Sequence, residues 1–320
     1  MRTRSLGSKG PEISVVGFGT WEAGGGVWGE NQSDEQVVAA IRAGLDAGMT
    51  WIDSAEVYGR GSSEELVGRA VASRDDALIA TKVAPRPAGT GFARDEVRKA
   101  WEGSLKRLGV GVIDLYQLHW PDGGIPIEET WEAMAALVEE GAVRSIGLSN
   151  FREPLIERCE RIRHVDSLQP HFSMLHPGNR DLIRWCGERG IGVVVYGPLA
   201  YGLLTGAVTK ETTFADDDWR SGKVFDSDYY AAMFAPGKIE RSIAVVDALR
   251  PVAERLDVTI AQLALAWAVA QPGVTSAIAG SRNPDHAREN AAAGDVELDD
   301  ATLAEIEELI PLGPDFEPRG

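Results

Sequence analysis

The chain has 320 residues and a mass of 34.4 kDa, a length that suits one large α/β barrel or about two ordinary domains. Hydrophobic residues make up 44% and charged residues 25% of the sequence, which excludes a chain that is disordered throughout. The 32 basic and 49 acidic residues leave a net charge of −17, which disfavours nucleic acids and anionic membranes as partners.

Short β-branched runs alternate with longer amphipathic segments from about residue 15 to residue 293, a pattern typical of βαβ units around a parallel sheet. The eight predicted strands are Val15–Gly19, Thr50–Asp53, Leu78–Lys82, Ile113–His119, Val143–Leu148, Ser167–Gln169, Gly192–Tyr196 and Val274–Ile278. The predicted helices include Ser33–Ala47, Glu64–Ala72, Ala93–Leu108, Ile127–Glu140 and Thr259–Ala270. Because no linker or repeat divides these pairs, we expect one (β/α)8 TIM-barrel domain over residues 1–320.

Three segments depart from a bare barrel repeat. Residues 201–238 form a long predicted loop, and an extra helix near Ile239–Leu256 follows it, ahead of the last barrel helices. A C-terminal helix is predicted at about Asp299–Leu309. A loop of this length in a compact domain is usually a functional lid or disordered, and we expect a lid.

Hydrophilic side chains stand at the ends of most predicted strands, where a buried parallel strand should be apolar. They are Asp53, Lys82, His119, Ser149, Asn150, Gln169 and Tyr196. Active sites of parallel barrels lie where the strands end and the βα loops begin. The pattern therefore predicts a shared site at the carboxyl-terminal mouth of the barrel.

Lys82 is the most informative of these residues, because the chain has only seven lysines against 25 arginines and this one directly follows an apolar strand pattern. A buried lysine needs a charged partner, and Asp53 at the end of the neighbouring strand is the best candidate. Tyr58 follows in the next loop and can return over the mouth. A cation beside a phenol favours the phenolate, so we expect Tyr58 to donate a proton near neutral pH.

Each of these residues alone has an ordinary structural explanation, as a buried ion pair, a core aromatic or a hydrogen-bonded histidine. Together, Asp53, Tyr58, Lys82 and His119 resemble the catalytic tetrad of the aldo-keto reductase superfamily, and the resemblance covers nearly the whole chain. The matching stretches are Gly48–Gly59, Asp114–Pro121, Gly147–Phe151 and Tyr196–Ala200. The sequence looks closest to the bacterial branch that includes the inositol-operon type reductases, on the stretches His119–Asp122 and Gly202–Gly206.

The resemblance implies an NADP(H)-dependent barrel that reduces an aldehyde or ketone to an alcohol, or catalyses the reverse oxidation. Tyr58 is then the general acid and base, tuned by Lys82, which Asp53 holds. His119 orients the carbonyl group. The residues implied in cofactor binding are Thr20, Trp21, Ser149, Asn150, Gln169, Tyr196, Gly197, Pro198, Leu199, Gly202, Arg220, Gly280, Ser281, Arg282, His286, Glu289 and Asn290.

Several of these residues have a more specific implied role. Ser149, Asn150 and Gln169 would hold the nicotinamide carboxamide, and Tyr196 would stack on the nicotinamide ring. Arg220 would clamp the pyrophosphate, although a solvated surface charge explains this residue equally well.

The segment Gly280–Asn290 follows the last strand and opens a helix, whose free N–H groups and positive dipole end favour an anion. Arg282 can hold two oxygens of the adenosine 2′-phosphate. His286 stands where related proteins often carry arginine or glutamine. A neutral histidine at this position binds the phosphate less tightly. We therefore expect NADPH to be preferred over NADH, with Arg282 as the main determinant.

The substrate pocket is expected to take a small carbonyl compound between Trp21, Trp28 and Trp120 of the first and fourth βα loops. No metal site is expected, because His164, His171 and His176 show no ligand pattern and suit hydrogen-bonding or surface roles. An alternative function is a nucleotide-sensing binding module of the same fold with slow or vestigial turnover. The complete tetrad argues against that alternative, and the oligomeric state stays open.

The sequence also bears on location in the cell. No apolar stretch approaches the roughly 18 residues that a membrane span needs. The amino terminus carries Arg2 and Arg4 without an apolar segment behind them, unlike a secretory signal. Cys159 and Cys186 form no disulfide framework or redox motif. We therefore expect a cytoplasmic protein.

Overall fold

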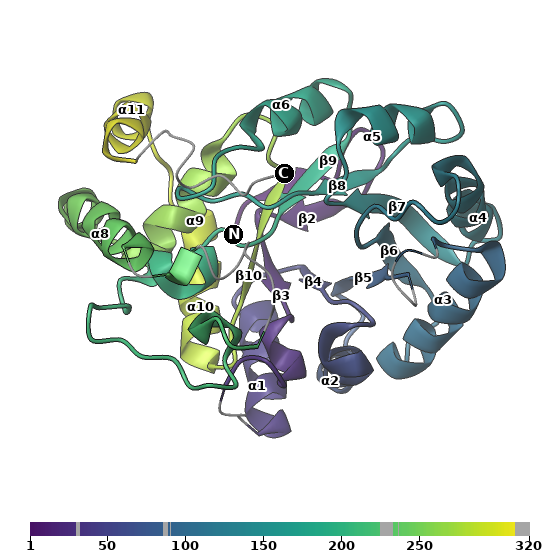
Figure 1. Ribbon diagram of the computed structural model, residues 1–320, viewed down its shortest axis with the longest axis horizontal. Coiled ribbons are helices and arrows are strands. Elements are labelled where there is room, and N and C mark those ends of the chain that lie inside the picture. Colours follow the sequence, from purple (N-terminus) through teal and green to yellow (C-terminus); the bar gives the residue numbers. More distant parts are fainter. Residues whose placement is uncertain (30–32, 86–88, 90, 225–232, 236, 311–320) are drawn as a thin grey trace.

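The computed structural model describes residues 1–29, 33–85, 89, 91–224, 233–235 and 237–310. Eight parallel strands close into a central barrel, and helices surround it (Figure 1). Neighbouring strands pair in chain order, and β10 pairs with both β9 and β3 to close the barrel. The predicted (β/α)8 TIM barrel is therefore confirmed. Its strands are β3 (Val16–Gly19), β4 (Trp51–Asp53), β5 (Leu78–Val83), β6 (Ile113–Leu118), β7 (Val143–Ser149), β8 (Ser167–Gln169), β9 (Gly192–Val195) and β10 (Ser276–Gly280).

The helices of the described chain form a ring outside the strands, with two additions. The ring consists of α1 (Asp34–Asp46), α2 (Ser62–Val71), α3 (Arg94–Leu108), α4 (Ile127–Glu139), α5 (Glu153–Glu160), α6 (Arg180–Glu188), α9 (Ile260–Ala270) and α10 (Pro284–Ala292). The additions, α8 (Lys238–Arg255) and α11 (Asp300–Leu309), contact each other at one side of the molecule (Figure 1). They confirm the extra helix and the C-terminal helix that the sequence predicts.

Local signals explain where several elements start and stop. At the start of α1, Ser33 Oγ accepts a hydrogen bond from Gln36 N while Ser33 N donates to the Gln36 side chain, both at 3.3 Å. This capping box satisfies two otherwise free helix N–H groups. Several predicted boundaries are displaced by one or two residues. For example, β10 starts at Ser276 because Val274 belongs to a turn in which its N–H donates to the Gln271 carbonyl.

A short antiparallel hairpin, which the sequence analysis does not predict, precedes the barrel. It consists of β1 (Thr3–Ser5) and β2 (Glu12–Ser14). Leu6 and Ile13 of this segment pack inside the barrel against Trp51 and other apolar side chains. The hairpin therefore closes the amino-terminal end of the barrel. Both strands lie ahead of residue 15, where the alternation of strands and helices that indicates the barrel begins.

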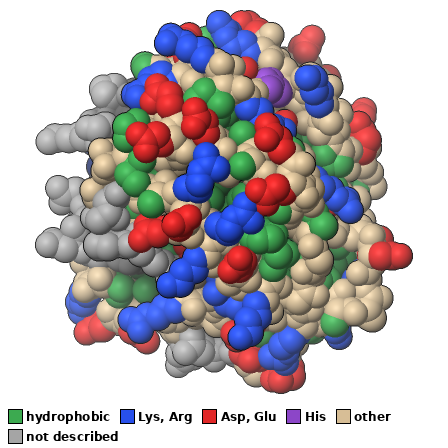
Figure 2. Space-filling view, turned by 90° about the vertical axis from the view of Figure 1, so that its right-hand side faces the viewer, with side chains coloured by type: hydrophobic (Ala, Val, Ile, Leu, Met, Phe, Trp, Pro, Cys, Tyr) green, Lys and Arg blue, Asp and Glu red, His purple; other side chains and the backbone are tan. Residues whose placement is uncertain are grey.

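Acidic and basic side chains are interspersed on the face shown in Figure 2. On the helices of that side, Arg98 pairs with Glu140 at 2.6 Å and Arg158 pairs with Glu128 at 2.7 Å. Exposed pairs of this kind stabilise a fold little, but they mix the two signs of charge across the face. Within the described ranges, every helix is too short or too polar to cross a membrane.

Candidate active site

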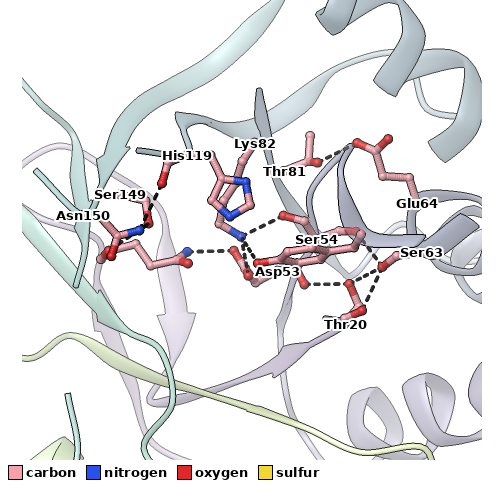
Figure 3. A network of polar contacts seen from close by, with 12 residues as sticks. Thr20, Asp53, Ser54, Ser63, Glu64, Thr81, Lys82, His119, Ser149 and Asn150 are labelled. Carbon is pink, nitrogen blue, oxygen red and sulfur yellow. Dashed lines mark hydrogen bonds and ion pairs between the residues drawn. The ribbon is translucent and has the colours of Figure 1, made fainter. Parts of the chain in front are cut away.

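Lys82 contacts Asp53 and Tyr58, two other residues predicted to carry the chemistry, at the carboxyl-terminal mouth of the barrel. Figure 3 shows Lys82 and Asp53 in the polar network at this place. Lys82 Nζ lies 2.6 Å from Asp53 Oδ2 and 2.9 Å from the Ser54 carbonyl oxygen. The same atom lies 3.4 Å from the Tyr58 hydroxyl oxygen. Lys82 is fully buried and Asp53 is almost so, so this ammonium group depends on the protein for its hydrogen bonds.

Tyr58 reaches the mouth because the chain turns back directly after β4. Its backbone N–H donates to the Ala55 carbonyl at 3.1 Å, and the short helix η2 (Tyr58–Gly61) starts there. Gly59 follows with φ of 55°, and a Cβ at that position would lie 2.3 Å from the Gly24 carbonyl oxygen. Only glycine fits this turn, so Gly59 helps to set the position of Tyr58.

Two carboxylates favour the charged form of Lys82, which burial disfavours. Burial lowers the pKa of Lys82, and the charges of Asp53 and Glu64 oppose that shift. Glu64 is itself fully buried on α2, where it accepts a hydrogen bond from Thr81 Oγ1 at 2.6 Å and pairs with Arg107 at 2.6 Å. The charges of Asp53 and Glu64 therefore favour an ammonium group next to the Tyr58 hydroxyl.

His119 lies beside Tyr58, with 5.5 Å between the ring centroids. Burial lowers the pKa of His119 well below 6.5, and the charge of Lys82 adds to the shift, so the imidazole is neutral at neutral pH. Its Nδ1 atom is buried and has no hydrogen-bond partner among the described residues. A proton on Nδ1 would be a buried donor without an acceptor. The neutral ring therefore carries its proton on Nε2.

Gln169 makes a contact within the site that the sequence did not predict. Its side-chain Nε2 donates to Asp53 Oδ1 at 2.8 Å, and both residues are buried. Gln169 therefore fixes the carboxylate that holds Lys82. The polar end of β8 was visible in the sequence, but its contact with β4 was not.

The other two residues predicted to hold the nicotinamide carboxamide lie next to His119. Asn150 Nδ2 donates to the His119 carbonyl at 3.1 Å and to Ser149 Oγ at 3.2 Å. Tyr196 Oη donates to Asn150 Oδ1 at 2.8 Å. The Tyr196 ring stacks on His171, with centroids 5.1 Å apart. These contacts link the ends of β6, β7 and β9 into one polar network.

His171 and His176 are both buried, so the surface alternative in their predicted role does not apply to either residue. Burial is the main cause that lowers the pKa of His171 well below 6.5 and that of His176 to about 4. In the part of the chain that the structure describes, no three His, Cys, Asp or Glu side chains are grouped as metal ligands would be.

A hollow of about 370 Å³ extends from Asp53 and Tyr58 to the start of α10. It also takes in most of the residues implied in cofactor binding. These are Thr20, Trp21, Tyr196, Gly197, Pro198, Leu199, Gly202, Arg220, Gly280, Ser281, His286, Glu289 and Asn290. Arg282 borders a smaller adjoining hollow, and its Nη2 reaches the Trp28 carbonyl oxygen at 3.4 Å.

The three tryptophans proposed for the substrate pocket do not share one place. Trp21 and Trp28 both line the main hollow, with ring centroids 4.9 Å apart. Trp120 packs against His119 instead, with 4.7 Å between the ring centroids. It is not among the residues that line this hollow. The structure thus separates Trp120 from the other two.

The described part of the long loop packs on the first βα loop. Trp219 N donates to the Val27 carbonyl at 2.8 Å, and the Trp219 ring lies 5.6 Å from that of Trp21. Arg220, the expected pyrophosphate clamp, pairs with Asp218 at 2.6 Å at the wall of the hollow. Residues 225–232 and 236 of the predicted lid lie outside the described residues.

The closed parallel barrel, with Asp53, Tyr58, Lys82 and His119 at its mouth, agrees with the resemblance of the sequence to the aldo-keto reductases. Residues 15–311 match the profile of the Aldo/keto reductase family. Aldo-keto reductase YhdN of Bacillus subtilis (strain 168) is 33% identical, over 99% of this chain and 97% of its own length. The chain therefore belongs to the aldo/keto reductase family.

Two further relatives bear on the cofactor. The NADH-specific methylglyoxal reductase of Escherichia coli (strain K12) is 30% identical, over 97% of this chain and 98% of its own length. An aldo-keto reductase of Klebsiella pneumoniae, solved in complex with NADPH, is 32% identical with a TM-score of 0.73. That match covers 98% of this chain and 97% of the Klebsiella chain. Placement in the inositol-operon type branch stays a prediction.

Proposed function

We propose that this protein reduces an aldehyde or ketone to an alcohol with NADPH, or catalyses the reverse oxidation, with Tyr58 as the general acid and base. Family membership and the NADPH-bound relative support the proposal. The observation that carries it is the 3.4 Å contact between Lys82 Nζ and the Tyr58 hydroxyl. An ammonium group at that distance stabilises the phenolate, so Tyr58 can transfer its proton near neutral pH.

The neighbours of Tyr58 have separable roles in this mechanism. Asp53 keeps Lys82 charged, and Gln169 keeps Asp53 in place. Neutral His119 offers its Nε2 proton to the carbonyl oxygen of a substrate beside Tyr58. A donor at that point stabilises the negative charge that develops on the oxygen during reduction.

NADPH, when bound, supplies the hydride for the carbonyl carbon. The residues of the hollow fit a dinucleotide, because aromatic side chains such as Tyr196 lie along it together with glycines and with the basic side chain of Arg220. Arg220 and Arg282 border the hollows from two segments and would hold phosphate oxygens.

Tyr58→Phe tests the assignment of the general acid. We expect kcat for any accepted aldehyde to fall by at least about 100-fold, because the variant lacks the transferable proton. The Kd for NADPH should stay close to the wild-type value, since only a hydroxyl is removed. Absorbance of NADPH over a panel of aldehydes and ketones gives kcat, and nicotinamide fluorescence gives Kd.

Tyr116→Phe is the matched control for this substitution. Tyr116 is fully buried on β6, and its hydroxyl has no hydrogen-bond partner among the described residues. This control should keep wild-type kcat. If Tyr58→Phe also kept it, Tyr58 would not be the acid. Tight NADPH binding by the wild type without turnover on the whole panel would instead favour the nucleotide-sensing role.

The preference for NADPH over NADH is assigned to Arg282. Loss of a charge-assisted contact costs roughly 1.5–3 kcal/mol, or about 10- to 150-fold in affinity. We therefore expect Arg282→Ala to weaken NADPH by that factor and to leave NADH nearly unchanged. Arg288→Ala, which removes an exposed arginine of α10 paired with Asp285, is the control. Equal losses for both cofactors would place Arg282 away from the 2′-phosphate.

A further inference from the structure

Glu22 brings a carboxylate into the wall of the main hollow. It follows Trp21 and starts the short helix η1 (Glu22–Gly24), where it is half-buried. Its Oε1 atom lies 3.1 Å from the position that a Cβ would take on Gly280. The carboxylate therefore stands at the end of β10, next to the segment that we expect to bind phosphate.

Charged groups from several elements face this carboxylate. Arg282 and His286 follow β10, and Arg220 belongs to η4 (Trp219–Ser221). Asp34 of α1 lines the smaller hollow together with Glu22 and Arg282, and Glu289 of α10 lines the main one. Burial raises the pKa of Glu22, while the two arginines and His286 oppose that shift.

The Glu22 carboxylate is not committed to a structural contact. Within the described ranges it forms no hydrogen bond and no ion pair. The charge of Glu22 therefore affects the hollow through its electrostatic interaction with Arg282 and Arg220, and the carboxylate does not hold the loop in place. A negative charge there reduces the positive potential that the arginines offer to a phosphate group.

We propose that Glu22 is a specificity-determining residue that narrows the preference of this protein for NADPH over NADH. The inference rests on the proposed function, in which Arg282 binds the 2′-phosphate. A phosphomonoester carries about −1.5 to −2 charges at pH 7. NADH has a hydroxyl group at the same place, so its affinity depends much less on the charge of Glu22.

Glu22→Gln tests this role, because it removes the charge and keeps the shape of the side chain. We expect the Kd for NADPH to fall by about 3- to 10-fold and the Kd for NADH to change by less than about twofold. Both are measured by nicotinamide fluorescence on the full chain. The difference should shrink at 1 M salt, where the screening length is about 3 Å. Glu22→Ala serves as a second variant.

Glu35→Gln is the matched control. Glu35 is an exposed residue of α1 paired with Arg69, so this variant changes the net charge equally without touching the main hollow. Its ratio of the two Kd values should equal that of the wild type. Equal changes of both Kd values in Glu22→Gln, or no change, would overturn the proposal. A loss of affinity for both cofactors would also overturn it, since Glu22 would then bind a part that they share.

The outcomes separate this proposal from the function on which it rests. If the wild type binds neither cofactor, the proposed function fails and the role of Glu22 fails with it. If the wild type binds and oxidises NADPH but the Kd ratio does not respond to Glu22, only the role of Glu22 fails.

Discussion

Asp53→Asn is expected to destabilise the fold by leaving the Lys82 ammonium group buried without its counter-charge. Lys82 is 0% exposed, and Asp53 Oδ2 lies 2.6 Å from its Nζ. Removing one partner of such a pair costs roughly 3–5 kcal/mol. This cost has an upper limit, because Lys82 can lose its proton instead of staying buried as an unpaired charge. From an ordinary pKa of 10.5, losing the proton at pH 7 costs about 4.8 kcal/mol.

Because the cost of removing the Lys82 proton falls as pH rises, the destabilisation caused by Asp53→Asn depends on pH. At pH 9, neutralising Lys82 costs only about 2 kcal/mol. In the folded variant the pKa of Lys82 is depressed below its unfolded value, so the free energy of unfolding rises with pH toward 10.5. We therefore expect Asp53→Asn to lose less stability, relative to wild type, at pH 9 than at pH 7.

Urea unfolding followed by tryptophan fluorescence at both pH values measures this loss. In the double variant of Asp53→Asn with Lys82→Met, no unpaired charge remains. Its free energy of unfolding should therefore fall by at least about 2 kcal/mol less than the sum of the decreases in the two single variants. Glu140→Gln breaks the exposed pair with Arg98 and should cost less than about 1 kcal/mol at either pH. Additive losses that do not change with pH would refute the ion-pair argument.

Two further predictions follow from buried groups and from the turn at Tyr58. The pKa of buried His176 is lowered from 6.5 to about 4, so between these pH values the unfolded chain binds a proton that the folded protein does not. The free energy of unfolding therefore has its full value above pH 6.5 and falls by about 3 kcal/mol as pH drops toward 4. Urea midpoints that stay flat between pH 7 and pH 4.5 would contradict this. Gly59→Ala should lower kcat at least about tenfold, because its Cβ would displace the turn that positions Tyr58. Gly26→Ala, also at positive φ (78°) but with nothing within 4 Å of its Cβ, should keep kcat, and equal losses would refute the steric explanation.

Sequence patterns by themselves determined the order of the elements and the end of the barrel at which the candidate catalytic residues lie. Strand and helix periods, and caps such as Ser33 with Gln36, depend on residues within one or two turns of each other. The polar ends of otherwise apolar strands are local features as well. Lys82 after an apolar run required a carboxylate nearby, and Asp53 was the candidate on the adjacent strand. Each of these inferences needed only neighbours in the chain or in strand order.

Closure of the barrel decided the contacts that sequence could not indicate. The hydrogen bond from Gln169 to Asp53 joins residues 116 positions apart, and it forms because β8 and β4 face each other across the mouth. The packing of His171 against Tyr196 and the approach of Glu22 to Gly280 likewise depend on how loops fold over that mouth. No periodic pattern specifies such contacts, since they follow from where whole strands and loops meet in three dimensions.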